Sequence, residues 1–229
     1  VHRERSPIRP GGIREGLAVL VAAVGLAMAP VARADCDGCV VAAIQELKGE
    51  MVRQFAEFPV ANIGDAMERL DIMDGGITPI WDGARCVGTA LPIYVTAGDN
   101  LAVIEALELI REGDVVCVNA GGFTGRAIMG DNLAQRFELF GATGAIVDGC
   151  VRDQAIIRDL GFPVFARGLS PAGPWKNGPG RIGEPIALGG VVINAGDIIA
   201  ADADGVAVIR PDAAPAILEA CRLVAATEA

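Results

Sequence analysis

Hydrophobic positions in the first part of the chain recur with the period of a helix. Between residues 40 and 55, apolar side chains are spaced three or four positions apart, which places them on one face of an α-helix. Lys48 and Glu50 fall on the opposite, polar face. A second, shorter helix is expected to begin at Asn62, whose side chain can cap the first backbone N–H groups, and to continue to Leu70.

The middle of the chain alternates between short apolar runs of strand length and segments with helical spacing. This alternation is typical of α/β units, in which helices join the strands of a partly parallel sheet. The predicted elements are a strand over 84–96, a helix from Asp99 or Asn100 to 110 that ends at Gly113, a strand over 114–120 followed by a glycine-rich loop, a helix over 131–140, a strand over 144–149, a helix over 153–160 and a strand over 163–168.

The last quarter of the chain has a different pattern. A loop rich in proline and glycine covers residues 170–185, and closely spaced strands with Gly and Asp turns follow it. Asp202 and Asp204 are expected in a β-turn before the last strand, and a final helix is expected from about Asp212. The sequence therefore predicts an α/β fold with a β-rich C-terminal part.

The N-terminal segment differs from the rest of the chain. Four arginines between residues 3 and 14 precede an apolar run over 16–28, and Ala-Arg-Ala at 32–34 comes before Asp35. This is the layout of a secretory signal peptide, and the apolar run is too short for a good membrane span. The alternative is an upstream region translated from an over-early start, because Val1 suggests a GUG codon read literally.

Under either interpretation, residues 1–34 do not belong to the fold. We expect a single domain over 35–229, located in the cytoplasm unless residues 1–34 are a genuine signal peptide that directs export. No membrane association is expected beyond such a signal.

Composition limits the core and the partners. Apolar residues make up 52% of the chain and aromatic residues only 4%, so the core must consist mainly of aliphatic side chains. The formal charge of −10 becomes −13 without the five arginines and two glutamates of residues 1–34. An acidic surface repels phosphate backbones, so we expect no nucleic-acid partner.

Rare residue types limit the chemistry. The single histidine, His2, lies in the N-terminal segment, which excludes a Ser-His-Asp or Cys-His relay and a histidine metal cluster from the domain. Cys36 and Cys39 have C-x-x-C spacing without a second pair nearby, whereas Cys86 and Cys117 lie in apolar runs and are expected to be inert buried side chains. Catalysis would therefore depend on carboxylates, arginines, backbone amides, water or a hard metal ion.

Two loops carry side chains suited to such chemistry. Gly130, Asp131, Asn132 and Leu133 lie at a predicted helix start, where free N–H groups and the helix dipole favour an anion such as a carboxylate. The alternative is that Asp131 is only the N-cap of the helix.

The second loop follows the strand over 144–149. Arg152 can bind a carboxylate through two parallel hydrogen bonds, and Asp153 offers oxygen ligands suited to Mg²⁺ or Mn²⁺. The alternative is an Arg152–Asp153 surface pair in which Asp153 caps the next helix.

Together, these loops and their surroundings resemble a known family. The stretch from Pro59 to Pro211 is similar to the RraA-like family, which includes 4-hydroxy-4-methyl-2-oxoglutarate and 4-carboxy-4-hydroxy-2-oxoadipate aldolases. The matching pieces are PVANIGDAM (59–67), AGDNLAVIEAL (97–107), GDVVCVNAGG (113–122), MGDNLA (129–134), GATGAIVDGCVRD (141–153), GFPVFARG (161–168), GGVVINAGD (189–197) and ADADGVAVI (201–209).

The resemblance implies a layered αββα fold that assembles as trimers or dimers of trimers, with active sites at subunit interfaces. It also implies a divalent metal, Mg²⁺ or Mn²⁺, at Asp153. Arg152 would hold a pyruvyl carboxylate together with the backbone amides of Asn132 and Leu133, and Asp131 would order water beside the metal. An acidic side chain from the C-terminal region of a neighbouring subunit is also implied. Glu219 and Glu228 are both candidates for it, and no motif distinguishes them.

The expected activity is that of a class II aldolase that forms pyruvate and also decarboxylates oxaloacetate. A lysine Schiff base is the other route for an aldolase. Lys48 lies on a polar helix face, which is a poor setting for it, and Lys176 lies in a long loop that is expected to be a surface loop, a lid or a subunit contact. The alternative function is non-catalytic regulation of a ribonuclease by protein contact, since the family's namesake, regulator of ribonuclease activity A, acts in that way.

Overall fold

A computed structural model describes residues 49–228 of the chain, with Glu228 described by its backbone alone. The N-terminal segment, Cys36 and Cys39 lie outside the described residues. Residues 49–54 are helical and continue into the 3₁₀-helix η1 (Phe55–Glu57), which agrees with the described end of the helix predicted over 40–55. Within the described part, no helix is long and apolar enough to cross a membrane.

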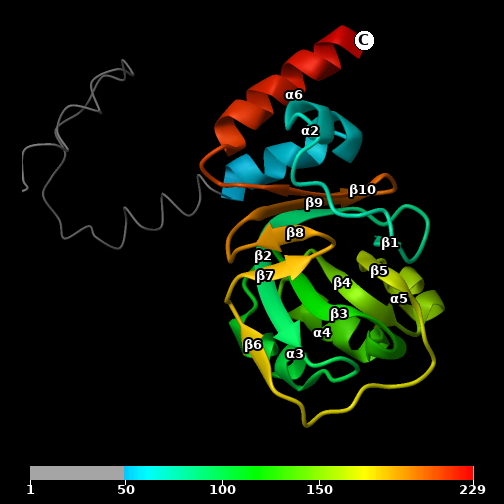
Figure 1. Cartoon of the computed structure of the whole chain (residues 1–229). Helices are drawn as coiled ribbons and strands as arrows, with labels where there is room; N and C mark the ends of the chain where they lie inside the picture. The colour runs from blue at the N-terminus through cyan, green and yellow to red at the C-terminus, as the bar shows by residue number, and fades with distance from the viewer. Residues whose placement is uncertain (1–48, 229) are drawn as a thin grey trace, which may run out of the picture. The chain divides into compact units, whose positions relative to one another are not determined.

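A large mixed sheet forms the centre of the domain (Figure 1). Its strand order is β1-β5-β4-β3-β2-β9-β10, and β6 also pairs with β2. Strands β2, β3, β4 and β5 run parallel to one another, whereas β1, β6, β9 and β10 pair antiparallel with their neighbours. The bounds are β1 Thr78–Pro79, β2 Cys86–Val95, β3 Asp114–Met129, β4 Gly144–Val151, β5 Val164–Leu169, β6 Gly180–Ile182, β9 Ile198–Asp202 and β10 Gly205–Ile209.

Helices and a small hairpin cover the two faces of the parallel strands. On one face, α3 (Leu101–Glu105), η2 (Ala106–Leu109), α4 (Asp131–Leu139) and α5 (Gln154–Leu160) share an apolar cluster with the sheet. On the other face lie β7 (Ile186–Leu188) and β8 (Val191–Ile193), which form a separate two-stranded sheet. All eight residues of β4 are buried because both of its faces are covered.

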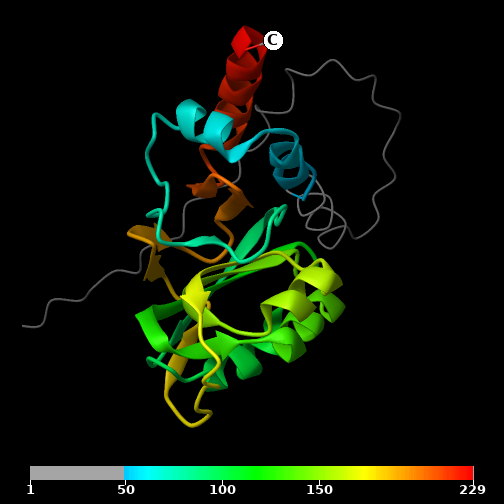
Figure 2. The same cartoon turned by 90° about the vertical axis from the view of Figure 1, so that its right-hand side faces the viewer.

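The antiparallel strands β9 and β10 carry a third layer. The helices α2 (Val60–Ala66) and α6 (Ala214–Glu228) pack on them through a separate apolar cluster that includes Ile63, Ile209 and Leu218. Figure 2 shows α2, in cyan, beside the red α6, with the two strands beneath them. The α/β fold with a β-rich C-terminal part is therefore confirmed.

The prediction that Asn62 caps the second helix is wrong. Helix α2 begins at Val60 after Pro59 and ends at Ala66, so Asn62 lies inside it. The Val60 backbone N–H is instead bound by Asp202 Oδ2 at 2.8 Å, a carboxylate 142 residues further along the chain. Local sequence does not reveal such a cap because its acceptor comes from another element.

The Asp202–Asp204 turn has the predicted form. Asp204 donates its backbone N–H to Asp202 Oδ1 at 3.0 Å, between β9 and β10.

Two segments predicted as loops form strand. The glycine-rich segment after Ala120 belongs to β3, which runs for 16 residues and pairs with β4 through several register shifts. Such shifts accommodate extra residues in one strand, and they allow the glycines to stay in the ladder. In the loop predicted over 170–185, residues Gly180–Ile182 pair antiparallel with β2 as β6.

Candidate active site

Two chain segments meet at the carboxyl ends of β3 and β4. Gly130 and Asp131 follow β3, and Arg152 and Asp153 follow β4. The Asp131 backbone N–H donates to Asp153 Oδ2 over 3.4 Å, and Arg152 Nε donates to the same oxygen over 3.2 Å. Parallel neighbours end at one edge of a sheet, which is where ligands bind in open α/β folds. The structure therefore brings the two predicted loops together.

Gly130, not Asp131, is the N-cap of α4. Its backbone is extended, and Asp131 is the first helical residue, with no capping bond from a side chain. The alternative in which Asp131 is only the N-cap is therefore wrong. A side chain at position 130 would collide with Asp153 Oδ2 and come within 3.0 Å of Arg152 Cγ. A side chain there would have to displace the side chains of Asp153 and Arg152, because the β4–α5 turn approaches the start of α4 so closely.

Asp153 adopts a left-handed backbone conformation, with φ 59° and ψ 34°. It stands at the N-cap position of α5, but its side chain makes no capping hydrogen bond, so its predicted role as a side-chain cap is wrong. Its carboxylate turns toward α4 and Arg152 instead. The predicted Arg152–Asp153 pair is present, with the side chains 44% and 31% exposed, so both remain reachable by a ligand.

A cavity of about 380 Å³ opens at this edge of the sheet. Three of its lining side chains are cationic and one is acidic, in a protein whose overall charge is strongly negative. A second hollow of about 350 Å³ shares Arg152 with this cavity and is completed by Asp153, Leu169, Ser170 and Pro171. The cavity is lined by Asn100, Ile104, Ile128, Met129, Gly130, Asp131, Asn132, Leu133, Arg136, Arg152, Pro174 and Lys176.

Asn100 is a site residue that the sequence pattern indicates only as a helix start. It is 4% exposed, and its Nδ2 donates to the Ile128 carbonyl at 2.8 Å. Among the described residues its Oδ1 has no hydrogen-bond partner, although this atom is buried. A buried acceptor without a donor is costly, which favours a ligand or water as its partner. Its position just beyond β2, a neighbour of β3, was the available signal.

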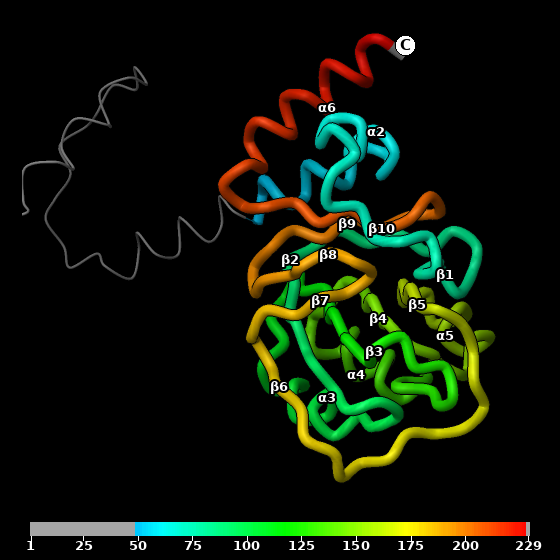
Figure 3. Tube along the Cα trace, in the orientation of Figure 1, coloured from blue at the N-terminus to red at the C-terminus, as the bar shows by residue number. Residues whose placement is uncertain are grey.

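Lys176 and Arg136 are two further residues that line the cavity and that the sequence did not place at the site. Lys176 lies in the segment between β5 and β6, yellow in Figure 3, and lines the cavity beside Pro174. Arg136 lines it from α4, one helical turn beyond Asn132. Glu219, by contrast, lies on α6 and pairs with Arg222 at 3.2 Å, while the side chain of Glu228 is outside the described residues.

The acidic residues of the site fit one kind of metal ion. Within residues 49–228, no cluster of three or more His, Cys, Asp or Glu side chains could enclose a metal. Asp131 nevertheless lines the cavity and Asp153 lines the adjoining hollow, and the Asp131 backbone N–H donates to Asp153 Oδ2. Mg²⁺ is commonly held by one or two carboxylates, with waters and substrate oxygens completing its shell. This pair therefore fits a hard divalent ion in that mode and does not suit zinc.

The same segments are shared with known proteins. Residues 60–208 match the family model RraA-like, described as Aldolase/RraA. The chain belongs to the RraA-like family. A protein of Halalkalibacterium halodurans named "Putative 4-hydroxy-4-methyl-2-oxoglutarate aldolase" is 40% identical over 160 residues, which cover 70% of this chain and 76% of that protein.

Two further proteins are similar to this chain. An Arabidopsis thaliana protein, "Putative 4-hydroxy-4-methyl-2-oxoglutarate aldolase 3", is 33% identical over 136 residues, or 59% of this chain and 82% of that protein. The crystal structure of Streptomyces coelicolor RraAS2, described as an unusual member of the RNase ES inhibitor RraA protein family, has a TM-score of 0.70 at 28% identity. That match covers 79% of this chain and 95% of the other. The RraA-like family thus includes proteins named as aldolases and as inhibitors.

Proposed function

We propose that this RraA-like protein is a class II pyruvate aldolase, a lyase. It cleaves 4-hydroxy-4-methyl-2-oxoglutarate or 4-carboxy-4-hydroxy-2-oxoadipate to pyruvate with Mg²⁺ or Mn²⁺, and it decarboxylates oxaloacetate. The observation that carries the proposal is the convergence of Arg152, the α4 N-terminus, Asp131 and Asp153 on a cationic cavity and the hollow that adjoins it at Arg152.

Arg152 and the start of α4 bind the 2-oxo acid in this proposal. The first N–H groups of a helix have no partner inside it, so those of Asn132 and Leu133 can donate to a carboxylate. Arg152 adds a charged, planar donor that matches both carboxylate oxygens. These contacts orient the substrate so that its 2-oxo group faces Asp131 and Asp153.

Bond cleavage requires a proton acceptor and an electron sink. Asp131 accepts the proton of the substrate's 4-hydroxyl, directly or through a water, while the C3–C4 bond breaks and its electron pair forms the enolate of pyruvate. A divalent ion, which Asp153 would hold while Asp131 orders water beside it, would act as a Lewis acid toward the 2-oxo group and stabilise the enolate charge. Protonation of C3 completes the formation of pyruvate. In oxaloacetate the same electron pair is released by loss of CO₂.

Pyruvate release tests the proposal. Purified protein is assayed with each substrate in the presence of Mg²⁺, Mn²⁺ or EDTA, corrected for the reaction of the metal alone. We expect turnover that EDTA abolishes and added metal restores, and a loss of about a hundredfold or more in Arg152→Ala. Arg158→Ala is the matched control because Arg158 lies exposed on α5, paired with Asp159. Normal turnover by a folded Arg152→Ala protein would contradict the proposed site.

The alternative class I mechanism has its own test. Lys176 lines the cavity and is the lysine that a Schiff base would use. Borohydride reduction in the presence of pyruvate would add a stable mass to Lys176 in that case. EDTA-resistant turnover together with this adduct would replace the class II mechanism.

A second candidate function comes from two solved relatives, one described as an unusual member of the RNase ES inhibitor RraA family and the other as the RNA-processing inhibitor RraA. In it, the acidic surface binds a basic partner protein without catalysis. Inhibition of a ribonuclease by protein that forms no pyruvate with any metal would support it.

We also propose that the protein is a homo-oligomer, a trimer or a dimer of trimers. A neighbouring subunit would then supply the further acidic side chain that the family resemblance implies. Sedimentation analysis measures the oligomeric state, and a monomer with full activity would contradict this proposal.

A further inference from the structure

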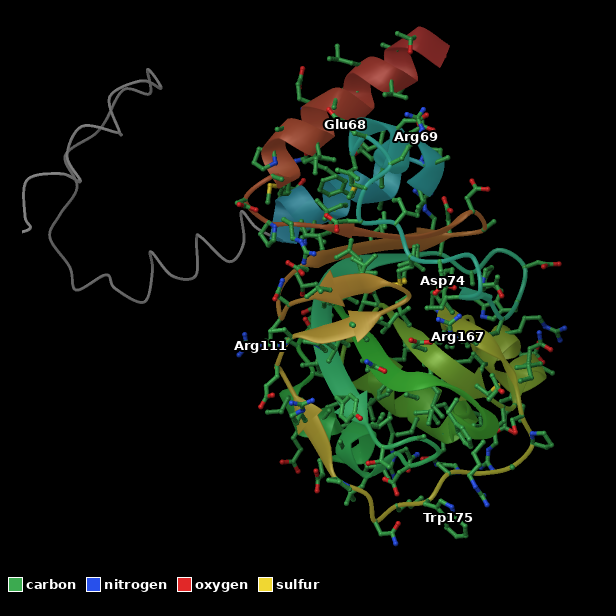
Figure 4. The ribbon with its side chains drawn as sticks, in the orientation of Figure 1. Glu68, Arg69, Asp74, Arg111, Arg167 and Trp175 are labelled. Atoms are coloured by element: carbon green, nitrogen blue, oxygen red, sulfur yellow. The ribbon has the colours of Figure 1, made fainter. Side chains whose placement is uncertain are left out.

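One wall of the cavity is a loop held mainly by hydrogen bonds. Residues 170–179 join β5 to β6, and Trp175, its large apolar side chain, is 59% exposed. Figure 4 shows Trp175 at the outer edge of the domain, far from the labelled Asp74 and Arg167. A loop with so little apolar burial depends on its polar contacts for a defined position.

Those contacts come from two neighbouring segments. The Trp175 N–H donates to the Gly98 carbonyl at 2.8 Å, and the Trp175 carbonyl accepts from the Asn100 N–H at 3.0 Å. Arg126 binds the Gly173 carbonyl at 2.8 Å and lies over the Trp175 ring at 4.3 Å from its centre.

Asp99 makes the largest single set of bonds to this loop. Its Oδ2 accepts from the backbone N–H groups of Asn177 at 2.8 Å and Gly178 at 2.9 Å, and its Oδ1 accepts from Leu101 at 2.8 Å. Asp99 is only 4% exposed. Burial would raise the pKa of its carboxyl, but these three backbone donors outweigh burial and hold the pKa below its usual value.

The contact between Asp99 and the loop is unusually close. A side-chain carbon at Gly178 would lie 2.9 Å from Asp99 Cγ, so only glycine permits this approach. Lys176 lies between Trp175 and Asn177, and both of these residues are bonded to the 98–100 segment. Asp99 is also the residue directly before Asn100, which lines the same cavity.

We propose that Asp99 is a positioning residue that fixes Lys176 and Asn100 at the cavity wall and thereby sets the affinity for the substrate. The Asp99 carboxylate joins the start of α3 to the 170–179 loop, so the side chains of Asn100 and Lys176 stay at a fixed distance from each other. Asparagine cannot replace it, because its single amide oxygen can serve either Leu101 or the Asn177–Gly178 pair, and its NH₂ group would face a donor. The role in affinity rests on the proposed function, whereas the anchoring of the loop does not.

The first test measures the loop directly. A lysine-specific protease can cut the chain at Lys48 and Lys176, its two lysines, and the fragments differ in mass. We expect cleavage at Lys176 to be about ten- to hundredfold faster in Asp99→Asn than in the wild type, because the loop opens locally. Gly178→Ala should have the same effect without altering Asp99, and it serves if Asp99→Asn fails to fold.

Asp114→Asn is the matched control. Asp114 is also buried, and it accepts two hydrogen bonds, from the Arg111 N–H at 2.9 Å and from Thr89 Oγ1 at 2.7 Å, but both donors lie outside the 170–179 loop. Equal acceleration in Asp114→Asn would mean that Asp99 acts on the whole fold, and an unchanged rate in both Asp99→Asn and Gly178→Ala would overturn the anchoring.

The second test measures affinity. Asp99→Asn should raise KM about tenfold and change kcat much less, since it displaces a binding wall and leaves Arg152 and Asp153 intact. If Asp99 acts through Lys176, the double variant with Lys176→Ala should have the KM of Lys176→Ala alone. Additive effects of the two substitutions would overturn the proposed coupling. Absence of turnover in the wild type would instead contradict the proposed function, and the proteolysis result would still decide whether Asp99 anchors the loop.

Discussion

At the scale of single residues, Asp153 combines a strained backbone with the proposed metal-binding carboxylate. A left-handed backbone costs most L-residues about 1–2 kcal/mol, but Asp and Asn tolerate it through their short polar side chains. Non-glycine residues in this conformation often cluster at functional sites, where surrounding contacts maintain them. The conformation turns the Asp153 side chain toward α4, which a regular helix start would not do.

This gives a prediction that separates charge from backbone. Asp153→Asn should keep the unfolding free energy within about 1 kcal/mol of the wild type but reduce turnover about a hundredfold or more, because it removes the charged ligand. Asp153→Ala should lose the same activity and a further ~1–2 kcal/mol of stability. Urea unfolding and pyruvate release measure the two effects. An active Asp153→Asn enzyme would exclude the carboxylate as a metal ligand.

At the scale of elements, α4 supports the site by packing on the sheet. Leu133, Ala134 and Phe137 face the core, and the Phe137 ring lies 6.3 Å from the Phe162 ring. The same helix presents its first turn to the cavity. The position of its N–H groups therefore depends on the apolar contacts on its buried face.

Phe137→Ala tests this support. Phe137 is fully buried, so its truncation should lower the unfolding free energy by about 3–5 kcal/mol. Leu139→Ala on the same helix should cost about 0.5 kcal/mol or less, because Leu139 is 82% exposed. Chemical denaturation of both variants measures the difference. Equal losses would contradict the packing of α4 on the sheet.

At the scale of the whole domain, an ion-pair network ties the segment before β1 to the parallel strands. Arg167 on β5 binds Asp74 at 2.9 Å (Figure 4). Arg167 also binds Asp148 on β4. The hydrogen bond from Arg167, together with one from the Gly76 backbone, holds the pKa of Asp74 below its usual value. Asp74 is about half exposed, so its contribution to stability is modest.

The network predicts a pH dependence of known sign. Because the pKa of Asp74 is lower in the folded than in the unfolded chain, its stabilising contribution is complete above the unfolded value of about 4 and is lost as the pH falls through the folded value. Asp74→Asn should therefore flatten the fall in urea midpoint below about pH 4. Arg158→Ala, outside the network, should leave the profile unchanged. A wild-type profile in Asp74→Asn would mean that Arg167 does not stabilise the ionised form.

The burial of the cysteines also depends on the fold of the whole domain. The four described cysteines, Cys86, Cys117, Cys150 and Cys221, are free and buried, which confirms the inert interpretation of Cys86 and Cys117. Burial raises the pKa of Cys86 to about 12, so its thiolate is not available for chemistry near neutral pH.

The sequence by itself determined the features that depend on local periodicity and on residue type. Apolar runs predicted the parallel strands, and helical spacing predicted α4. The absence of histidine from the domain excluded histidine-based catalysis and left arginines and carboxylates such as Arg152 and Asp153 as candidates. The motifs around those residues also identified the family. These signals are local because hydrophobic burial imposes the same period on any strand or helix that it covers.

Only the tertiary structure decided which distant residues meet. It assigned the cap of α2 to Asp202, extended β3 through a glycine-rich segment, and placed Asn100 and Lys176 at the cavity. Each of these outcomes depends on a backbone donor or strand edge that finds its partner on another element, sometimes more than a hundred residues away. Local propensity cannot predict such partners, because a buried polar group forms its hydrogen bond with whichever element the packing brings within reach.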